Sequence, residues 1–294
     1  MTTHDARPLQ DRTVLITGAT DGLGRALAHH LAAQGATLIL HGRNAAKGQA
    51  LLAELHDRTG NGRLTFEQAD FASLDQIRAM ADRLAARDRL DVLVNNAGIG
   101  VETIPQRSAD GLELTFQVDY LATYMLSCLL TPLLARTAAA RSATARPSPA
   151  GIVNVSSAGQ APLDFDDVLL ERGWDGVQAY CQAKLAQIML TFDHAELLRD
   201  HGVTVNALHP ASYMPTKIVT RLFAVQSTLD EGVANTARLV TDPALAAVIG
   251  AYFNRARPAQ AHHQAYDAVS RARLLEISRR LTGVPFPSTP LQPA

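Results

Sequence analysis

Short, almost entirely apolar segments alternate with longer Ala/Leu-rich segments along most of the chain, and this alternation is its strongest constraint on the fold. TVLIT (13–17) precedes LGRALAHHLAAQG, and ATLILHG (36–42) precedes AAKGQALLAELHDRTG. Further strand-like segments are LTFEQAD (64–70), LDVLVNNAG (90–98), GIVNVSS (151–157) and VTVNALHP (203–210). Apolar strands that alternate with helix-length segments are typical of a parallel sheet covered by helices on both faces. The sequence therefore predicts a doubly wound α/β fold, which binds ligands at the carboxyl ends of its strands.

The segment RTAAARSATARPSPA (136–150) lacks an apolar face and is rich in Ala, Arg, Ser and Pro. It is predicted to be a flexible surface loop before the strand that begins near residue 151. No composition shift or internal repeat marks a second domain, so residues 1–294 are expected to form one domain. Within it, residues 211–294 are expected to form a substrate lid and C-terminal helices.

Composition and charge exclude several classes of function. The formal net charge is −1 and the pI about 6.8, which gives no electrostatic reason to expect nucleic-acid binding. Residues 1–13 contain no apolar segment, and no uninterrupted apolar run approaches the roughly 18–20 residues that span a bilayer. Neither the isolated Cys128 and Cys181 nor the His pairs at 29–30 and 262–263 have metal-site spacing. We expect a cytoplasmic protein without a bound metal and without a membrane anchor.

A glycine-rich turn, TGATDGLG (17–24), follows the first strand-like segment and opens a helix. Gly18 permits a tight turn, while Gly22 and Gly24 let the backbone approach a pyrophosphate closely. The helix N-terminus adds unpaired N–H groups and the positive end of the helix dipole. This order of strand, glycines and helix predicts a Rossmann-type dinucleotide site, with Gly18, Thr20, Asp21, Gly22, Leu23 and Gly24 contacting the cofactor.

The next segment, HGRN (41–44), bears on the choice of cofactor. An enzyme that selects NAD usually has an acidic residue near this position, whereas an arginine suits the 2′-phosphate of NADP. Gly42 occupies the expected acidic position, and Arg43, Asn44 and Lys47 follow it. Because guanidinium matches phosphate geometry, we expect NADP(H) in preference to NAD(H), with Arg43 and Asn44 at the cofactor. The alternative is a solvated arginine at the start of a helix.

Three motifs in this order, TGATDGLG, NNAG (95–98) and YCQAK (180–184), resemble those of the short-chain dehydrogenase/reductase family in its single-domain branch. The resemblance covers about residues 10–285 and is strongest to retinol-dehydrogenase-like bacterial members. It implies an oxidoreductase whose catalytic residues are Ser157, Tyr180, Lys184 and, where the family has asparagine, Asp119. It also implies cofactor contacts from Asp70, Phe71, Asn96, Ala97, Gly98, Tyr180, Lys184, Pro210, Ala211, Tyr213 and Thr216.

Tyr180 and Lys184 stand four residues apart, so on a helix they share one face. A cation about 5 Å from a phenol lowers its pKa by roughly two units from about 10. We therefore expect Tyr180 to exchange a proton with the substrate oxygen while Ser157 orients that oxygen. An ionised Asp119 would compete with Tyr180 for the influence of Lys184, so Asp119 is expected to have a raised pKa or a partner. Our hypothesis is a working site with altered pH dependence.

The predicted substrate is a lipophilic or aromatic alcohol/carbonyl pair, and its candidate contacts are Pro162, Leu163, Trp174, Tyr213, Met214 and Phe223. For each residue taken singly, ordinary packing in the core or in a lid is the better explanation, because aromatic and Met side chains commonly fill cores. One alternative is a catalytically silent NADP-binding sensor or scaffold. Another is sugar-nucleotide epimerisation or dehydration, which uses the same Tyr/Lys pair. Enzymes of that kind resemble a longer branch with the motif TGxxGxxG and an extra C-terminal substrate domain, and this chain has neither feature. The apolar segments 112–135 and 176–198 could form a homodimer seam, which the long insert before Tyr180 could obstruct, so the assembly state stays open.

Overall fold

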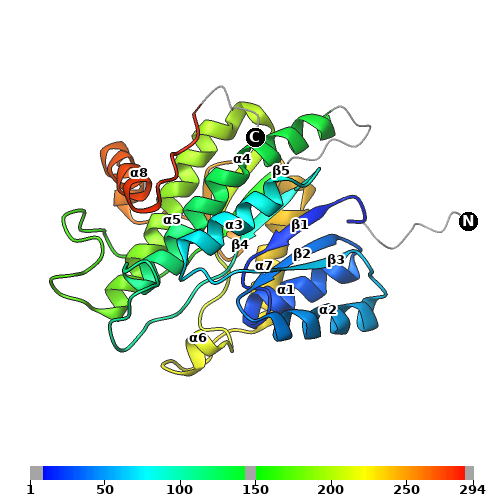
Figure 1. The fold of residues 1–294 in the computed structure, drawn as a ribbon, viewed down its shortest axis with the longest axis horizontal. Helices are drawn as coiled ribbons and strands as arrows, with labels where there is room; N and C mark the ends of the chain where they lie inside the picture. The colour runs from blue at the N-terminus through cyan, green and yellow to red at the C-terminus, as the bar shows by residue number, and fades with distance from the viewer. Residues whose placement is uncertain (1–8, 143–149, 289–294) are drawn as a thin grey trace, which may run out of the picture.

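One mainly parallel sheet of eight strands forms the centre of the protein (Figure 1). The computed structural model describes residues 9–142 and 150–288. Within these residues the strand order is β3-β2-β1-β4-β5-β6-β7-β8, and β7–β8 is the one antiparallel pair of the sheet. The strands are β1 (Thr13–Ile16), β2 (Thr37–Gly42), β3 (Leu64–Gln68), β4 (Val92–Asn95), β5 (Ala150–Val155), β6 (Val203–His209), β7 (Ala251–Asn254) and β8 (Arg257–Pro258). The doubly wound α/β prediction is confirmed, although the sequence did not indicate β7 or β8.

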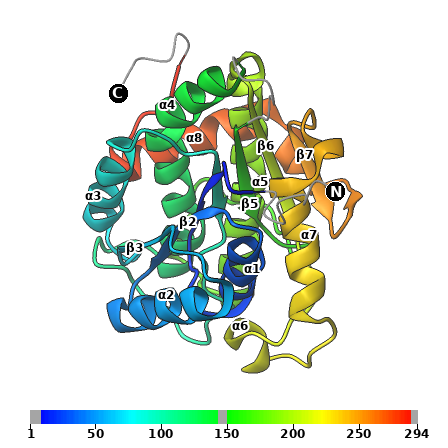
Figure 2. The same cartoon turned by 90° about the vertical axis from the view of Figure 1, so that its right-hand side faces the viewer.

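Helices cover both faces of the sheet, as Figure 2 shows end-on. One face carries α3 (Leu74–Ala85), α4 (Ala122–Ser142) and α5 (Gly176–Leu198), and the other carries α1 (Gly22–Ala33), α2 (Ala45–Thr59) and α7 (Leu229–Thr241). Each layer has its own cluster of buried apolar side chains. The π-helix η1 (Phe116–Leu121) runs directly into α4 in the first layer. Outside the two layers lie α6 (Lys217–Thr220), α8 (Ala268–Thr282) and the 3₁₀ turns η2 (Arg199–His201), η3 (Pro243–Leu245) and η4 (His263–Tyr266).

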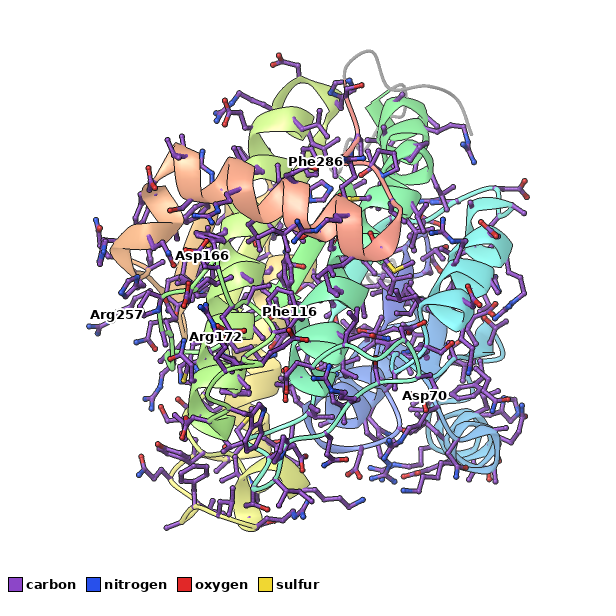
Figure 3. All side chains as sticks on the ribbon, turned by 60° about the vertical axis from the view of Figure 1, so that its left-hand side comes forward. Asp70, Phe116, Asp166, Arg172, Arg257 and Phe286 are labelled. Atoms are coloured by element: carbon purple, nitrogen blue, oxygen red, sulfur yellow. The ribbon has the colours of Figure 1, made fainter. Side chains whose placement is uncertain are left out.

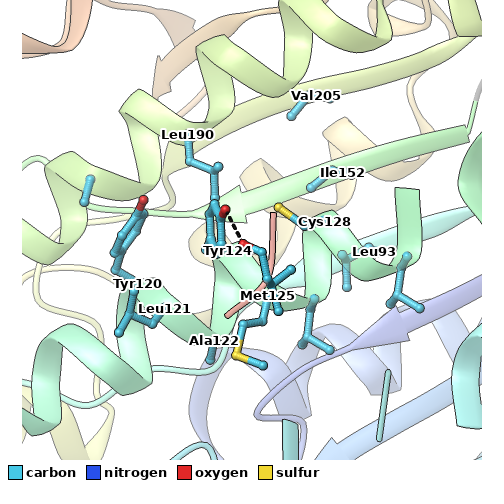
Figure 4. Close-up of a cluster of buried hydrophobic side chains, with 14 of the residues drawn as sticks. Leu93, Tyr120, Leu121, Ala122, Tyr124, Met125, Cys128, Ile152, Leu190 and Val205 are labelled. Carbon is cyan, nitrogen blue, oxygen red and sulfur yellow. Dashed lines mark hydrogen bonds between the residues drawn. The ribbon is translucent and has the colours of Figure 1, made fainter. Parts of the chain in front are cut away.

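The consecutive helices η1 and α4 pass through the core beside the sheet. Tyr120, Tyr124 and Cys128 lie among side chains of β5 and β6 such as Ile152 and Val205 (Figure 4). By length and composition Phe116–Arg141 would suit a membrane span, but 78% of its most apolar 18-residue window is buried inside the protein. Its apolar residues therefore pack the core of the domain.

The prediction of a loop over residues 136–150 is wrong in its first half, because α4 continues to Ser142. Thr137 is buried, and Arg141 forms an ion pair with the buried Asp91. Alanines favour the helix, and these tertiary contacts hold its last two turns against the sheet. Residues 143–149 lie outside the described part of the chain.

Helix α8 crosses the outer side of α4 and α5, and the segment after it carries Phe286 back along them (Figure 3). The hydroxyl groups of Tyr120 and Ser278 lie 2.7 Å apart, and Tyr124 donates a 2.9 Å hydrogen bond to the main-chain oxygen of Val284. The Phe286 ring packs against His194 of α5, with centroids 4.7 Å apart. The chain itself thus covers part of the helix surface that we considered for a dimer seam.

Candidate active site

A cleft of about 710 Å³ opens at the carboxyl ends of the central strands. The chain runs outward from β1 in one direction to β2 and β3, and in the other direction to β4, β5 and β6. Ligands of doubly wound sheets bind at this reversal of strand order. Every residue predicted to contact the cofactor lines the cleft, from Gly18 in the first turn to Thr216 before α6, and so does Ser157. Asp119 lies behind the cleft wall.

The turn between β1 and α1 is built around close backbone packing. Gly18 has φ 64° and Gly22 has φ 51°, which favour glycine. At Gly24, a Cβ would lie 2.4 Å from both the Gly18 oxygen and the Asn96 side chain. Asn96 also donates a 2.8 Å hydrogen bond to the main-chain oxygen of Thr17. The NNAG segment after β4 therefore holds the glycine-rich turn in place.

His41, which no sequence motif identified, links the glycine-rich turn to the segment that follows β3. Its Nδ1 accepts a 3.2 Å hydrogen bond from the Gly18 amide, and its Nε2 lies 3.1 Å from the Ala69 oxygen. The ring stacks on Phe71 at a centroid distance of 4.1 Å. Burial lowers the pKa of His41 to about 4, so the neutral ring can accept from Gly18 while donating to Ala69. The sequence feature that could have identified His41 is its position as a histidine at the end of an apolar strand.

The end of β2 brings basic side chains to one end of the cleft. Arg43 and Lys47 are both exposed and line the cleft. Asn44 also lines it, but its side chain caps α2 by accepting a 2.9 Å hydrogen bond from the Lys47 amide. Asp70, at the end of β3, accepts a 3.0 Å hydrogen bond from the Ala72 amide. This end of the cleft can hold the adenosine part of a dinucleotide, with cations beside the ribose.

Helix α5 carries Tyr180 and Lys184 to the cleft floor. Asp175 caps its first turn by accepting a 2.7 Å hydrogen bond from the Gln178 amide, and Gly176 follows. A Cβ at Gly176 would lie only 2.0 Å from the Glu102 oxygen, so glycine permits the helix to start against that loop. The position of this first turn sets the depth at which Tyr180 and Lys184 meet the cleft.

Ser157, Tyr180 and Lys184, the catalytic residues that the resemblance implied, come together in the cleft. Lys184 is 5% exposed, and its Nζ lies 5.6 Å from the centre of the Tyr180 ring. The side chain of Ser157, which follows β5, is close enough to the Tyr180 hydroxyl to lower the pKa of the phenol. Tyr252 donates a 2.9 Å hydrogen bond to the main-chain oxygen of Ser157 and so fixes that turn. A phenol, a hydroxyl and an ammonium group are therefore directed at one point of the cleft.

Asp119 approaches Lys184 from η1, which packs against α5. The residue lies in the π-helix η1, a geometry often found at functional sites, and is fully buried. One carboxylate oxygen accepts a 2.7 Å hydrogen bond from the Ile99 amide, and the other lies 3.0 Å from Lys184 Nζ. Burial raises the pKa of Asp119, and Lys184 opposes that rise. We expected a raised pKa or a partner for this carboxylate, and the structure shows both.

The ion pair changes the electrostatics of the phenol. Burial raises the pKa of Tyr180, and the lowering effects of Lys184 and of Ser157 do not offset it. Asp119 raises the pKa of Tyr180 further. Burial alone would lower the pKa of Lys184, but Asp119 and Tyr180 raise it, so the amine stays charged. Our expectation of a lowered Tyr180 pKa is therefore wrong for this structure, because it omitted burial.

The predicted substrate residues divide into two groups. Tyr213, Met214 and Phe223 line the cleft, whereas Pro162, Leu163 and Trp174 do not, so the structure favours the packing alternative for those three over a substrate contact. Leu163 is in the core, where Gln264 holds both its main-chain groups at 2.8 and 3.1 Å. Trp174 donates a 3.3 Å hydrogen bond to Glu113. The insert before Tyr180 is thus tied to neighbouring segments instead of folding over the cleft.

Further apolar residues outside the recognised motifs also line the cleft, among them Val101, Val177, Ile218 and Val219. Sequence periodicity gave no signal for them, since they come from loops and helix ends far apart in the chain. Within residues 9–142 and 150–288, no group of three or more His, Cys, Asp or Glu side chains could hold a metal ion.

Known proteins resemble the chain in both sequence and structure. The model of the family described as short chain dehydrogenase matches residues 12–226. Human retinol dehydrogenase 13 is 30% identical over 96% of this chain and 88% of its own. Human polyprenol dehydrogenase is 30% identical over 94% and 87% of the two chains. A short chain dehydrogenase from Escherichia coli CFT073, solved with NADPH, superposes with a TM-score of 0.67 at 25% identity, covering 86% of this chain and all of its own.

Proposed function

The chain belongs to the short-chain dehydrogenase family of oxidoreductases, and we propose that it uses NADP(H) to interconvert an alcohol and a carbonyl group on a lipophilic molecule. One observation carries this proposal. The glycine-rich turn, Arg43 and the Ser157–Tyr180–Lys184 group all line one cleft at the reversal of strand order. An elongated dinucleotide needs phosphate-binding amides and catalytic groups in one such continuous space.

The end of β2 supports NADP(H) over NAD(H). A Cβ at Gly42 would lie 2.8 Å from Thr20 Cγ2, so the acidic side chain that selects NAD has no room there without a shift of Thr20. Arg43 and Lys47 supply exposed cations beside that position. The E. coli relative solved with NADPH agrees with this choice.

NADPH, held by the glycine-rich turn and Arg43, would supply the hydride that reduces the carbonyl group. Ser157 donates a hydrogen bond that orients the carbonyl oxygen, and Tyr180 gives that oxygen its proton, so that an alcohol and a phenolate result. Lys184 stabilises the phenolate electrostatically until a proton returns from solvent through the open cleft. In the reverse direction, Tyr180 takes the proton from the alcohol.

The cleft mouth supports a lipophilic substrate. Val177, Tyr213, Ile218 and Phe223 line the cleft and are 53%, 41%, 40% and 40% exposed. Tyr213 and Phe223 pack together with ring centroids 5.2 Å apart. Exposed apolar side chains gathered around one opening mark a site for an apolar ligand. Two relatives are named for retinol and polyprenol, which are apolar alcohols.

The test is NADPH consumption with aldehydes and ketones of increasing apolar length. We expect Tyr180→Phe to lower turnover by about 10²–10⁴-fold, because it removes the proton donor, and to weaken NADPH binding far less, because the ring stays in place. Tyr266→Phe is the matched control, since Tyr266 is 47% exposed and does not line the cleft. NADPH binding without turnover of any substrate would instead support the sensor or scaffold alternative. Equal activity in both variants would refute the role of Tyr180.

A further inference from the structure

Gln187 lies on α5, three residues after Lys184, and it is fully buried. Its Oε1 accepts a 3.3 Å hydrogen bond from Lys184 Nζ. Its Nε2 donates to the main-chain oxygen of Asp119 at 2.8 Å and to the Thr123 hydroxyl at 3.1 Å. Since an ammonium group only donates and a carbonyl oxygen only accepts, these contacts fix the amide orientation. Both ends of the Gln187 amide are therefore committed, one to the lysine and one to η1.

The ammonium group of Lys184 has three N–H bonds and three protein acceptors around it. Asp119 Oδ2 lies 3.0 Å away, Gln187 Oε1 3.3 Å and the main-chain oxygen of Val155 3.5 Å. The contact with Val155 is at the outer limit of a hydrogen bond and is the weakest of the three. Lys184 also lines the cleft, so its ammonium group can most easily exchange this hydrogen bond to Val155 for one to a ligand in the cleft.

We propose that Gln187 is a positioning residue of this site: it holds the Lys184 ammonium group against Asp119, so that only one N–H is free to turn towards the cleft. This inference rests on the proposed oxidoreductase function. Gln187 reaches Asp119 through the main chain, whereas the carboxylate reaches Lys184 directly, so the three residues form a closed ring of contacts. Removing one member of the ring loosens the amine without removing its charge.

The ionisable groups around this ring are few, and each has a defined direction of effect. Asp119 and Tyr180 both act on Lys184 and favour its charged form. Glu113 acts on Asp119, and Cys181 acts on Tyr180, and both raise the pKa of the group they face. Gln187 carries no charge, so replacing it alters the position and hydrogen bonding of Lys184 without adding a titrating group.

The direct test is Gln187→Met, which keeps the side-chain length and removes both hydrogen-bonding ends. Because the ammonium group loses a charge-assisted hydrogen bond and its fixed position, it stabilises the Tyr180 phenolate less. We expect the Tyr180 pKa to rise by about one unit, and the acid limb of kcat/KM for alcohol oxidation to move up in pH by the same amount. We also expect kcat to fall by about tenfold with substrate KM changed less than about twofold.

Gln182→Met is the matched control. Gln182 is also fully buried on α5 and donates a 2.8 Å hydrogen bond to a main-chain oxygen, that of Val168, but it does not line the cleft. Both variants should lower the melting temperature, and only Gln187→Met should move the pH profile. If the profiles of the two variants coincide with that of the unchanged protein, Gln187 is only structural and the proposal is overturned.

Two further measurements keep the test decisive. The Tyr180 pKa is followed by NMR with tyrosine labelled at the phenol carbon, and Tyr180→Phe assigns the signal. This readout does not need turnover, so an inactive unchanged protein would refute the proposed function while leaving the test of Gln187 intact. If Gln187→Met does not fold, Gln187→Asn keeps a neutral amide at this buried position but shortens it by one methylene group, which withdraws the acceptor from Lys184. The Tyr180 pKa should again rise, and an unchanged titration would overturn the proposal.

Discussion

Replacing Asp119 by asparagine tests the electrostatics of the site most directly, because it removes a charge and leaves the shape almost unchanged. The carboxylate lies 3.0 Å from Lys184 Nζ, and that amine lies 5.6 Å from the Tyr180 ring centre. The carboxylate oxygen is therefore at most about 9 Å from the ring. At an effective dielectric constant of about 20, a unit charge at about 9 Å changes the free energy of ionisation by about 1.8 kcal/mol, slightly more than one pKa unit.

The sign follows from the charges. A carboxylate disfavours the phenolate, so Asp119→Asn should lower the Tyr180 pKa by at least about one unit. Alcohol oxidation requires a deprotonated Tyr180, and its activity rises with pH through that pKa. The acid limb of kcat/KM should therefore move to lower pH, opposite to the shift expected for Gln187→Met. The free energy of unfolding should fall by about 3 kcal/mol, because Lys184 loses its buried partner.

The assay is the pH profile of NADP-dependent alcohol oxidation, together with the NMR titration of Tyr180. Asp91→Asn is the matched control, since Asp91 is also fully buried and pairs with Arg89 at 2.7 Å, away from the cleft. It should destabilise the protein without moving the profile. Loss of turnover in folded Asp119→Asn, or a shift to higher pH, would refute the reasoning.

Three further predictions concern the cofactor, the core and the cleft mouth. Arg43→Ala should raise KM for NADPH by about 10–100-fold and alter that for NADH by less than about twofold, whereas Arg58→Ala, in the last turn of the following helix α2, should change neither. Burial lowers the pKa of His194 to about 3, so the unfolded chain binds the extra proton first and stability falls as pH drops from about 6.5. His194→Gln should flatten that loss in unfolding measured from neutral pH to about 4, and an equally steep loss would contradict it. Phe223→Ser should raise KM about fivefold for long apolar substrates and little for short ones, so an equal effect on both would exclude an apolar contact.

Three segments show which structural features depend on nearby residues in the chain and which depend on contacts with distant ones. The alternation of apolar and helical segments predicted the sheet correctly because strands buried on both faces must be apolar wherever they lie. The prediction of a loop at 136–142 failed because Thr137 and Arg141 gain their contacts from β4 and its neighbours, which composition does not reveal. Pro162, Leu163 and Trp174 follow Ser157 in the chain, but their segment is bound to η4 and to Glu113 instead.

By itself, the sequence determined the fold class, the position of the glycine-rich turn and the pairing of Tyr180 with Lys184, because each depends on residues close together in the chain. Only the tertiary structure decided the charge state around the phenol. Asp119 reaches Lys184 from η1, far from it in the chain, and is fully buried, while Gln187 binds the lysine from the next turn of α5. Desolvation and ion pairing depend on what surrounds a group in space, and neighbours brought together by packing have no fixed spacing in the sequence.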